Sequence, residues 1–143
     1  LLKAKRVELK LENKIIFYDK MPFEKLESIT KKAYLGCTLD KATNINYELS
    51  LPNKLFDYIH AGVPVLASNL KEVAKVVQQH EVGIVLTDLS PESIANSINS
   101  LVQDESKRDF YHLNCLKARS HLNWENEEKE LISCYNSIGN SGK

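Results

Sequence analysis

The 143-residue sequence predicts an α/β fold, in which a parallel sheet is flanked by helices. Short apolar runs alternate with longer amphipathic segments along the chain, as expected when helices connect parallel strands. The clearest run, Val63–Ala67, has no polar residue, which is typical of a strand buried on both faces. A chain of this size buries roughly 70% of its unfolded surface, so one domain can hold a stable core.

The first part of the chain is predicted to contain two helices and two strands. A helix over 1–11 leads to a strand at Ile15–Tyr18, and a helix over Phe23–Ala33 leads to a strand at Tyr34–Leu39. The polar segment Asp40–Glu48 follows as a loop. It is long for a connection between a strand and a helix, and long loops often carry function.

The next predicted helix has two distinct faces. At helical spacing, one face is apolar and consists of Leu51, Leu55, Phe56 and Ile59. The other face is polar and consists of Ser50, Asn53, Lys54 and Asp57. Ser50 is a suitable N-cap, Pro52 suits the first turn, and Gly62 ends the helix before the Val63–Ala67 strand. One side of this helix therefore faces a core and the other is available for a ligand.

The rest of the chain is predicted to continue the alternation. A helix at Lys71–Gln79 leads to a strand at Gly83–Leu86, and Ser90 with Pro91 is a helix start signal. Helices are also expected over 105–121 and 125–136. Residues 1–137 are therefore expected to form the domain, followed by a flexible tail at 138–143.

Composition excludes several classes of function. The 19 basic and 19 acidic side chains cancel, so no basic surface favours nucleic acid as a partner. No apolar run approaches the ~20 residues of a membrane-spanning helix. Cys37, Cys115 and Cys134 form no C-x-x-C pair and indicate reduced thiols in the cytoplasm. Cysteine and histidine spacing predicts no metal site.

The polar face of the predicted 50–61 helix suggests a nucleotide site. Free N–H groups at a helix start bind anions, with help from the helix dipole. Asp57, two turns along, can accept two hydrogen bonds from a diol. A phosphate at the helix start and a sugar diol at the carboxylate together describe a nucleotide. The alternative is that Lys54 and Asp57 form an ordinary solvated i, i+3 pair.

The segment SLPNKLFDYIHAGVPVLAS resembles the donor-site signature of the group 1 (family 4) glycosyltransferases. This family consists of retaining enzymes with two Rossmann-like domains, the GT-B fold, whose C-terminal domain binds a nucleotide sugar. The resemblance implies that Asp57 holds the ribose, while the backbone N–H groups of Ser50 and Leu51 meet the diphosphate. It assigns Lys54 to the phosphates or to the positioning of Asp57. The family's preceding acidic position falls on Leu49, with Glu48 as the neighbouring substitute.

The segment KIIFYDKMPFEKL resembles the part of the family that contacts the nucleotide base, which makes Lys20 and Met21 candidate base neighbours. By the same resemblance the chain is a partial C-terminal domain. The N-terminal acceptor domain and the first part of the donor domain, with its phosphate clamp, are missing. Catalysis occurs between the two domains, so no catalytic residue is expected here. The diphosphate is usually stabilised by protein groups, so neither a metal nor a cofactor is expected.

The sequence therefore predicts part of a donor-binding domain that transfers a sugar from a nucleotide sugar, with retention, to a saccharide or lipid-linked acceptor. The intact enzyme is expected in the cytoplasm, or peripheral to the inner membrane. Two central strands would be missing, so the strand at Ile15–Tyr18 should pair directly with the one at Tyr34–Leu39, with some self-association through exposed edges. The alternatives are a sugar-nucleotide epimerase of the same fold and a non-catalytic doubly wound binding module. A receiver domain would need further acids beside Asp40.

Overall fold

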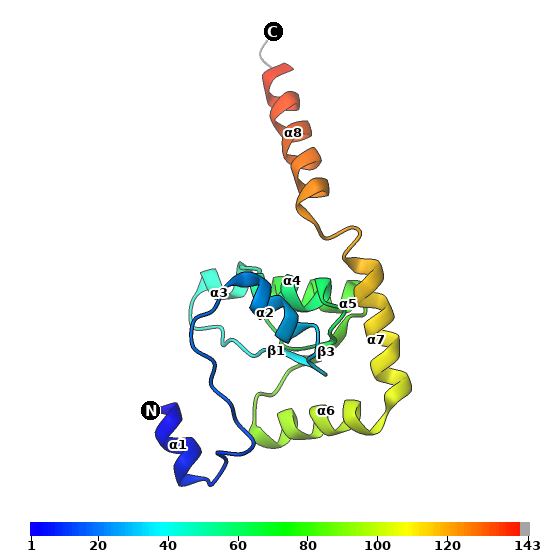
Figure 1. The fold of residues 1–143 in the computed structure, drawn as a ribbon. Coiled ribbons are helices and arrows are strands. Elements are labelled where there is room, and N and C mark those ends of the chain that lie inside the picture. The colour runs from blue at the N-terminus through cyan, green and yellow to red at the C-terminus, as the bar shows by residue number, and fades with distance from the viewer. Residues whose placement is uncertain (141–143) are drawn as a thin grey trace.

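A computed structural model describes residues 1–140, which form eight helices around a parallel sheet of three strands (Figure 1). The strands are β1 (Gly36–Thr38), β2 (Val65–Ser68) and β3 (Gly83–Leu86), in the order β1-β2-β3. Val65 of the central strand pairs with Gly36 on one side and with Gly83 on the other. The predicted α/β class, with a parallel sheet flanked by helices, is confirmed.

The helices follow the predicted alternation with the strands. They are α1 (Leu2–Glu8), α2 (Phe23–Thr30), α3 (Ile45–Leu49), α4 (Asn53–His60), α5 (Lys71–Gln79), α6 (Pro91–Gln103), α7 (Glu105–Ala118) and α8 (Trp124–Asn140). In Figure 1, α4 and α5 lie above the sheet and α6 lies below it, while α8 extends away from the body. None of the helices described is long and apolar enough to cross a membrane.

The core forms where α4, α5 and α7 meet the central strand. All four residues of β2 are buried, as expected for a strand with a neighbour on each side. Leu55 and Ile59 of α4 are fully buried in the same cluster as Val73 of α5 and Cys115 of α7. The apolar face predicted for α4 therefore fixes that helix against the sheet.

Several local signals gave the correct element boundaries. α5 and β3 begin and end where the sequence predicted. Ser90 caps α6, since its Oγ accepts a hydrogen bond from the N–H of Ser93 at 3.2 Å. Gly62 follows α4 with a φ of 73°, a left-handed conformation that glycine adopts without strain.

The predicted strand at Ile15–Tyr18 is wrong. The segment has no regular secondary structure and pairs with no strand within residues 1–140, and the sheet ends at β1. A strand needs a hydrogen-bonded neighbour, and here the carbonyl of Ile15 accepts instead from Nη1 of Arg6 at 2.9 Å. The guanidinium of Arg6 also lies 5.4 Å from the centre of the Phe17 ring. The expected direct pairing with the Tyr34–Leu39 segment is therefore wrong too.

The loop predicted at Asp40–Glu48 instead leads into a short helix, α3. The side chain of Asn44 caps α3 by accepting from the N–H groups of Asn46 and Tyr47. Ser50 ends α3, and Pro52 is the N-cap of α4, so the predicted capping role of Ser50 is wrong. The sequence signal failed here because Asn44 and Ser50 are both good capping residues.

The last helix is longer than predicted. The tail expected at 138–143 is helical as far as Asn140, because α8 continues four residues beyond the predicted end at 136. Residues 141–143 of that predicted tail lie outside the described residues.

Candidate functional site

The predicted polar face of α4 does not line one crevice. Its residues are divided among three separate hollows, because Tyr47 of α3 and the α3–α4 turn border the start of the helix on one side while α2 packs against α4 near Asp57. A further hollow lies at the carboxyl ends of the strands.

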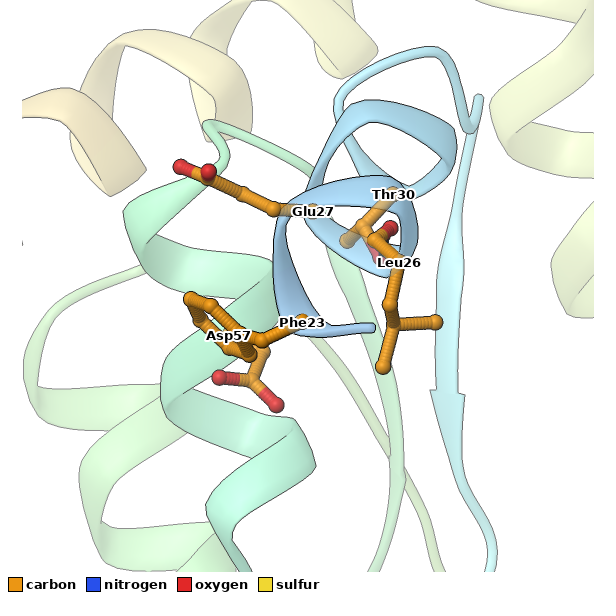
Figure 2. A pocket seen from close by; sticks show the side chains of 5 residues that line it. All are labelled: Phe23, Leu26, Glu27, Thr30 and Asp57. Carbon is orange, nitrogen blue, oxygen red and sulfur yellow. Dashed lines mark hydrogen bonds between the residues drawn. The ribbon is translucent and has the colours of Figure 1, made fainter. Parts of the chain in front are cut away.

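Asp57 borders the first of these, the α2 hollow, whose other lining residues all come from α2: Phe23, Leu26, Glu27 and Thr30. Figure 2 shows the Asp57 carboxylate beside the ring of Phe23. The hollow encloses only ≈ 20 Å³, room for about one water molecule. The Asp57 side chain makes no hydrogen bond or ion pair with residues 1–140, so a ligand lying across the rim can reach its oxygens.

Ser50 and Lys54 meet in a second hollow, the Lys54 hollow, which measures ≈ 140 Å³. Its lining residues are Asp40, Tyr47, Ser50, Pro52, Lys54 and Leu70. Asp40 follows β1 closely, whereas Lys54 lies in the first turn of α4. The hollow therefore joins the carboxyl edge of the sheet to the start of the helix.

An ion pair crosses this hollow. Nζ of Lys54 lies 2.8 Å from Oδ2 of Asp40, and the same oxygen accepts from Oγ1 of Thr38 at 3.2 Å. The hydrogen bond from Lys54 lowers the pKa of Asp40 below its ordinary value, and the bond from Thr38 acts in the same direction. The ion-pair partner of Lys54 is thus Asp40 rather than Asp57, and the simple i, i+3 pair is not formed.

The further hollow, the strand-end hollow, measures ≈ 330 Å³ and lies where the three strands end. Its lining residues are Asp40, Lys41, Ala42, Ser68, Asn69, Leu70, Leu86, Thr87 and Leu89. Ligands of open parallel sheets bind outside the carboxyl ends of the strands. Both position and polar lining make this hollow part of the candidate site.

Leu51 and Asn53 lie elsewhere, in an apolar cavity of ≈ 540 Å³ beside the start of α8. The other lining residues are Phe56, His60, Val76, Leu122, Asn123, Trp124 and Glu127. His60 is held by a 2.6 Å contact from Nε2 to the carbonyl oxygen of Leu122. The side chains of Leu51 and Asn53 are therefore separated from those of Lys54 and Asp57.

The remaining predicted residues lie outside these hollows. Glu48 is exposed in α3 and lines none of them. Lys20 is exposed and Met21 is half-buried in the segment before α2. Met21 comes two residues before Phe23, which places this segment next to the α2 hollow along the chain.

Asp40 is the site residue that the sequence prediction missed. A signal was available, since the residue follows an apolar run and so falls at the carboxyl end of a parallel strand. The sequence does not predict that Asp40 pairs with Lys54, because that contact depends on how the α3–α4 turn folds over the sheet.

Comparison with known proteins gives one family. The profile of the glycosyl transferases group 1 matches residues 1–114. An uncharacterized glycosyltransferase of Methanocaldococcus jannaschii is 28% identical over 132 residues, which cover 91% of this chain and 32% of that protein.

Solved structures show the same fold. Sucrose-phosphate synthase from Thermosynechococcus elongatus matches 99% of this chain with a TM-score of 0.77 and 16% identity, over 34% of its own length. WaaG, a glycosyltransferase involved in lipopolysaccharide biosynthesis, matches 84% of this chain with a TM-score of 0.64 and 18% identity, over 30% of its length. The chain thus spans about a third of each of these proteins.

Proposed function

The chain belongs to the group 1 glycosyltransferases, and on that premise we propose that it binds the nucleotide-sugar donor of a retaining enzyme. It corresponds to the later part of the C-terminal domain of a GT-B protein. The acceptor, a saccharide or a lipid-linked sugar, binds a domain outside this chain. The epimerase and the non-catalytic binding module are not favoured by the family match.

The observation that carries the proposal is the position of Asp57. Its carboxylate lies unpaired at the surface of α4, beside Phe23, and Phe23 follows the Lys20–Met21 segment closely along the chain. A nucleotide whose base rests on that segment brings its ribose hydroxyls to Asp57. A carboxylate suits a ribose because it accepts hydrogen bonds from both hydroxyls of a diol.

The start of α4 supplies the phosphate contacts in this proposal. The N–H groups of Ser50 and Leu51 precede the helix, and Lys54 lies in its first turn. Phosphates are favoured there by unpaired N–H groups and the helix dipole. Asn53 stays a candidate although its side chain lines the apolar cavity, and Glu48 stays a candidate for a sugar contact although it lines none of the hollows.

Replacing Asp57 with alanine tests the ribose contact. Each hydrogen bond to a charged acceptor contributes roughly 1.5–3 kcal/mol, so Asp57→Ala should weaken nucleotide binding by at least about tenfold. The exposed Asp57 side chain is not part of the core, so the fold should persist. Amide chemical shifts of the ¹⁵N-labelled chain, followed during titration with UDP, GDP and ADP, give the affinities.

The matched control is Asp109→Ala, since Asp109 lies on the exposed surface of α7. Equal affinities for Asp57→Ala and wild type would refute the ribose contact.

The 143-residue chain alone should transfer no sugar. It spans about a third of its relatives, and the proposed reaction needs an acceptor domain and a phosphate clamp outside this chain. Nucleotide affinity of the chain alone should be in the millimolar range, which titrations followed by amide chemical shifts detect. Incubation with radiolabelled nucleotide sugars and saccharide acceptors, followed by product separation, measures transfer. A labelled product above the level of the heat-denatured chain would contradict the two-domain proposal.

The location of the intact enzyme is proposed on the same basis: the cytoplasm, or the surface of the inner membrane, where lipid-linked acceptors are available.

Self-association of the isolated chain is also proposed. Ile16 and Tyr18 are 68% and 61% exposed, and on α8 Tyr135 and Ile138 are 69% and 68% exposed. Such exposed apolar side chains favour contact with a second surface.

A further inference from the structure

The geometry points to a second recognition element within the proposed donor site, and this inference rests on the proposed function. We propose that Asp40 and Lys54 act as a pair, in which Lys54 contacts a donor phosphate and Asp40 accepts hydrogen bonds from hydroxyls of the transferred sugar. The ligand class is therefore a sugar joined to a phosphate, the part of a nucleotide sugar that a free nucleotide lacks.

Asp40 is placed between two hollows. It lines the Lys54 hollow together with Tyr47 and Ser50, and it lines the strand-end hollow together with Asn69 and Thr87. Asp40 and Leu70 are the residues that the two hollows share. A ligand that extends from one hollow into the other must pass the Asp40 carboxylate.

The chemistry of the pair suits two different groups of one ligand. Oδ2 of Asp40 already accepts from Lys54 and Thr38, while a carboxylate offers about four lone-pair positions. Lys54 has three N–H donors, of which Asp40 takes one. Both groups thus keep capacity for a ligand. Their side chains are 41% and 33% exposed for Lys54 and Asp40, so a ligand can reach them.

Asp40 is also held in its acceptor form. The hydrogen bonds from Lys54 and Thr38 lower its pKa, so the side chain is ionised near neutral pH and can only accept. A sugar offers hydroxyl donors, whereas a phosphate offers only negative charge. The carboxylate therefore favours a hydroxyl-bearing ring on its side of the ion pair and repels a second phosphate there.

The residues that line the two hollows agree with a phosphate beside Lys54 and a sugar ring beside Asp40. The strand-end hollow has ≈ 330 Å³ and includes the polar side chains of Ser68, Asn69 and Thr87, which can bond to hydroxyls. The Lys54 hollow is smaller, with ≈ 140 Å³, and carries the cation. The smaller hollow suits a phosphate and the larger one suits a sugar ring.

The Asp40–Lys54 pair also lies close enough to Asp57 for one nucleotide sugar to contact all three residues. Lys54 and Asp57 are three residues apart on α4, so their Cβ atoms lie about 5–6 Å from each other on one side of the helix. A ribose at Asp57 and a phosphate at Lys54 are adjacent groups in a nucleotide. The donor would then run along α4 from the α2 hollow toward the strand ends.

The test compares a nucleotide with its sugar derivative in four forms of the ¹⁵N-labelled 143-residue chain: wild type, Asp40→Asn, Lys54→Met and the control Asp109→Asn. The probes are UDP with UDP-glucose and GDP with GDP-mannose, at concentrations up to the millimolar range. Asp40→Asn keeps the size of the side chain and removes its charge. Asp109 forms a surface ion pair with Arg108 on α7, away from the hollows.

In wild type, both members of a probe pair should shift the amide signals of residues 53–57, and only the sugar derivative should also shift those of Lys41, Asn69 and Thr87. Asp40→Asn should lose these additional shifts and bind the sugar derivative about tenfold more weakly, while its affinity for the nucleotide changes less than about threefold. Lys54→Met should weaken both probes, and Asp109→Asn should match wild type.

Two results would overturn the inference while leaving the proposed function intact. In one, Asp40→Asn and wild type respond to the sugar derivative in the same way, so the carboxylate makes no sugar contact. In the other, Asp40→Asn loses affinity for nucleotide and sugar derivative equally, which indicates only a structural role of the ion pair. If no probe shifts residues 53–57 of wild type, the proposed donor site itself is refuted, and the inference with it.

Discussion

Gly83→Ala is expected to prevent the chain from folding. A Cβ atom at this position would lie 1.8 Å from the carbonyl oxygen of Val65, and 2.7 and 2.8 Å from its carbonyl carbon and nitrogen. These are backbone atoms of the central strand, in the register that pairs β2 with β3. These atoms cannot move without breaking the sheet. The free energy of unfolding should therefore fall by more than about 4–5 kcal/mol, a loss that few single substitutions cause.

Circular dichroism during thermal unfolding measures this effect. Gly36→Ala is the informative comparison, because the added Cβ would meet the ring of Tyr58 at 2.3 Å, a side chain rather than backbone. Truncating that ring in the double variant Gly36→Ala, Tyr58→Ala should recover stability relative to Gly36→Ala. No side-chain truncation should rescue Gly83→Ala. A cooperative transition near the wild-type temperature for Gly83→Ala would show that β2 and β3 are not paired in this register.

The elements that the sequence predicted correctly are those with complete local signals. α5 is an amphipathic segment that the sequence delimits at both ends, and β3 is a short apolar run between a turn and a capped helix. Ile15–Tyr18 has the same apolar appearance as β3, yet it forms no strand in the described chain. The difference lies in the neighbour, since β3 pairs with β2 and the earlier segment has no strand beside it. Composition alone does not supply that partner.

The sequence predicts which polar side chains α4 carries, but not how the structure distributes them. Helical periodicity placed Ser50, Lys54 and Asp57 on one polar face. In the structure Ser50 ends α3 instead of capping α4, and the side chain of Lys54, although on α4, pairs with Asp40 rather than with Asp57. Helical periodicity holds only within one helix. Because α4 begins after Pro52, Ser50 does not continue the polar face of α4.

Leu55→Ala should give the second large loss of stability, and it links the core to the site. The Leu55 side chain is fully buried in the core cluster between α4 and the sheet. Truncating a buried leucine costs about 2–5 kcal/mol, through lost apolar burial and the remaining cavity. A domain has only about 5–15 kcal/mol of stability, so the variant should remain folded at low temperature and unfold at a clearly lower one.

Leu113→Ala is the matched control, because Leu113 on α7 is 55% exposed and its truncation should change stability by less than about 0.5 kcal/mol. Urea unfolding of both variants gives the free energies. Leu55 lies directly after Lys54 on α4, so its loss should also loosen the helix that carries Lys54 and Asp57. The changes in amide chemical shift that a nucleotide causes at residues 53–57 should therefore be smaller in Leu55→Ala, even at temperatures at which the variant is folded. Equal unfolding free energies for the two variants would show that α4 is not held to the sheet through its apolar face.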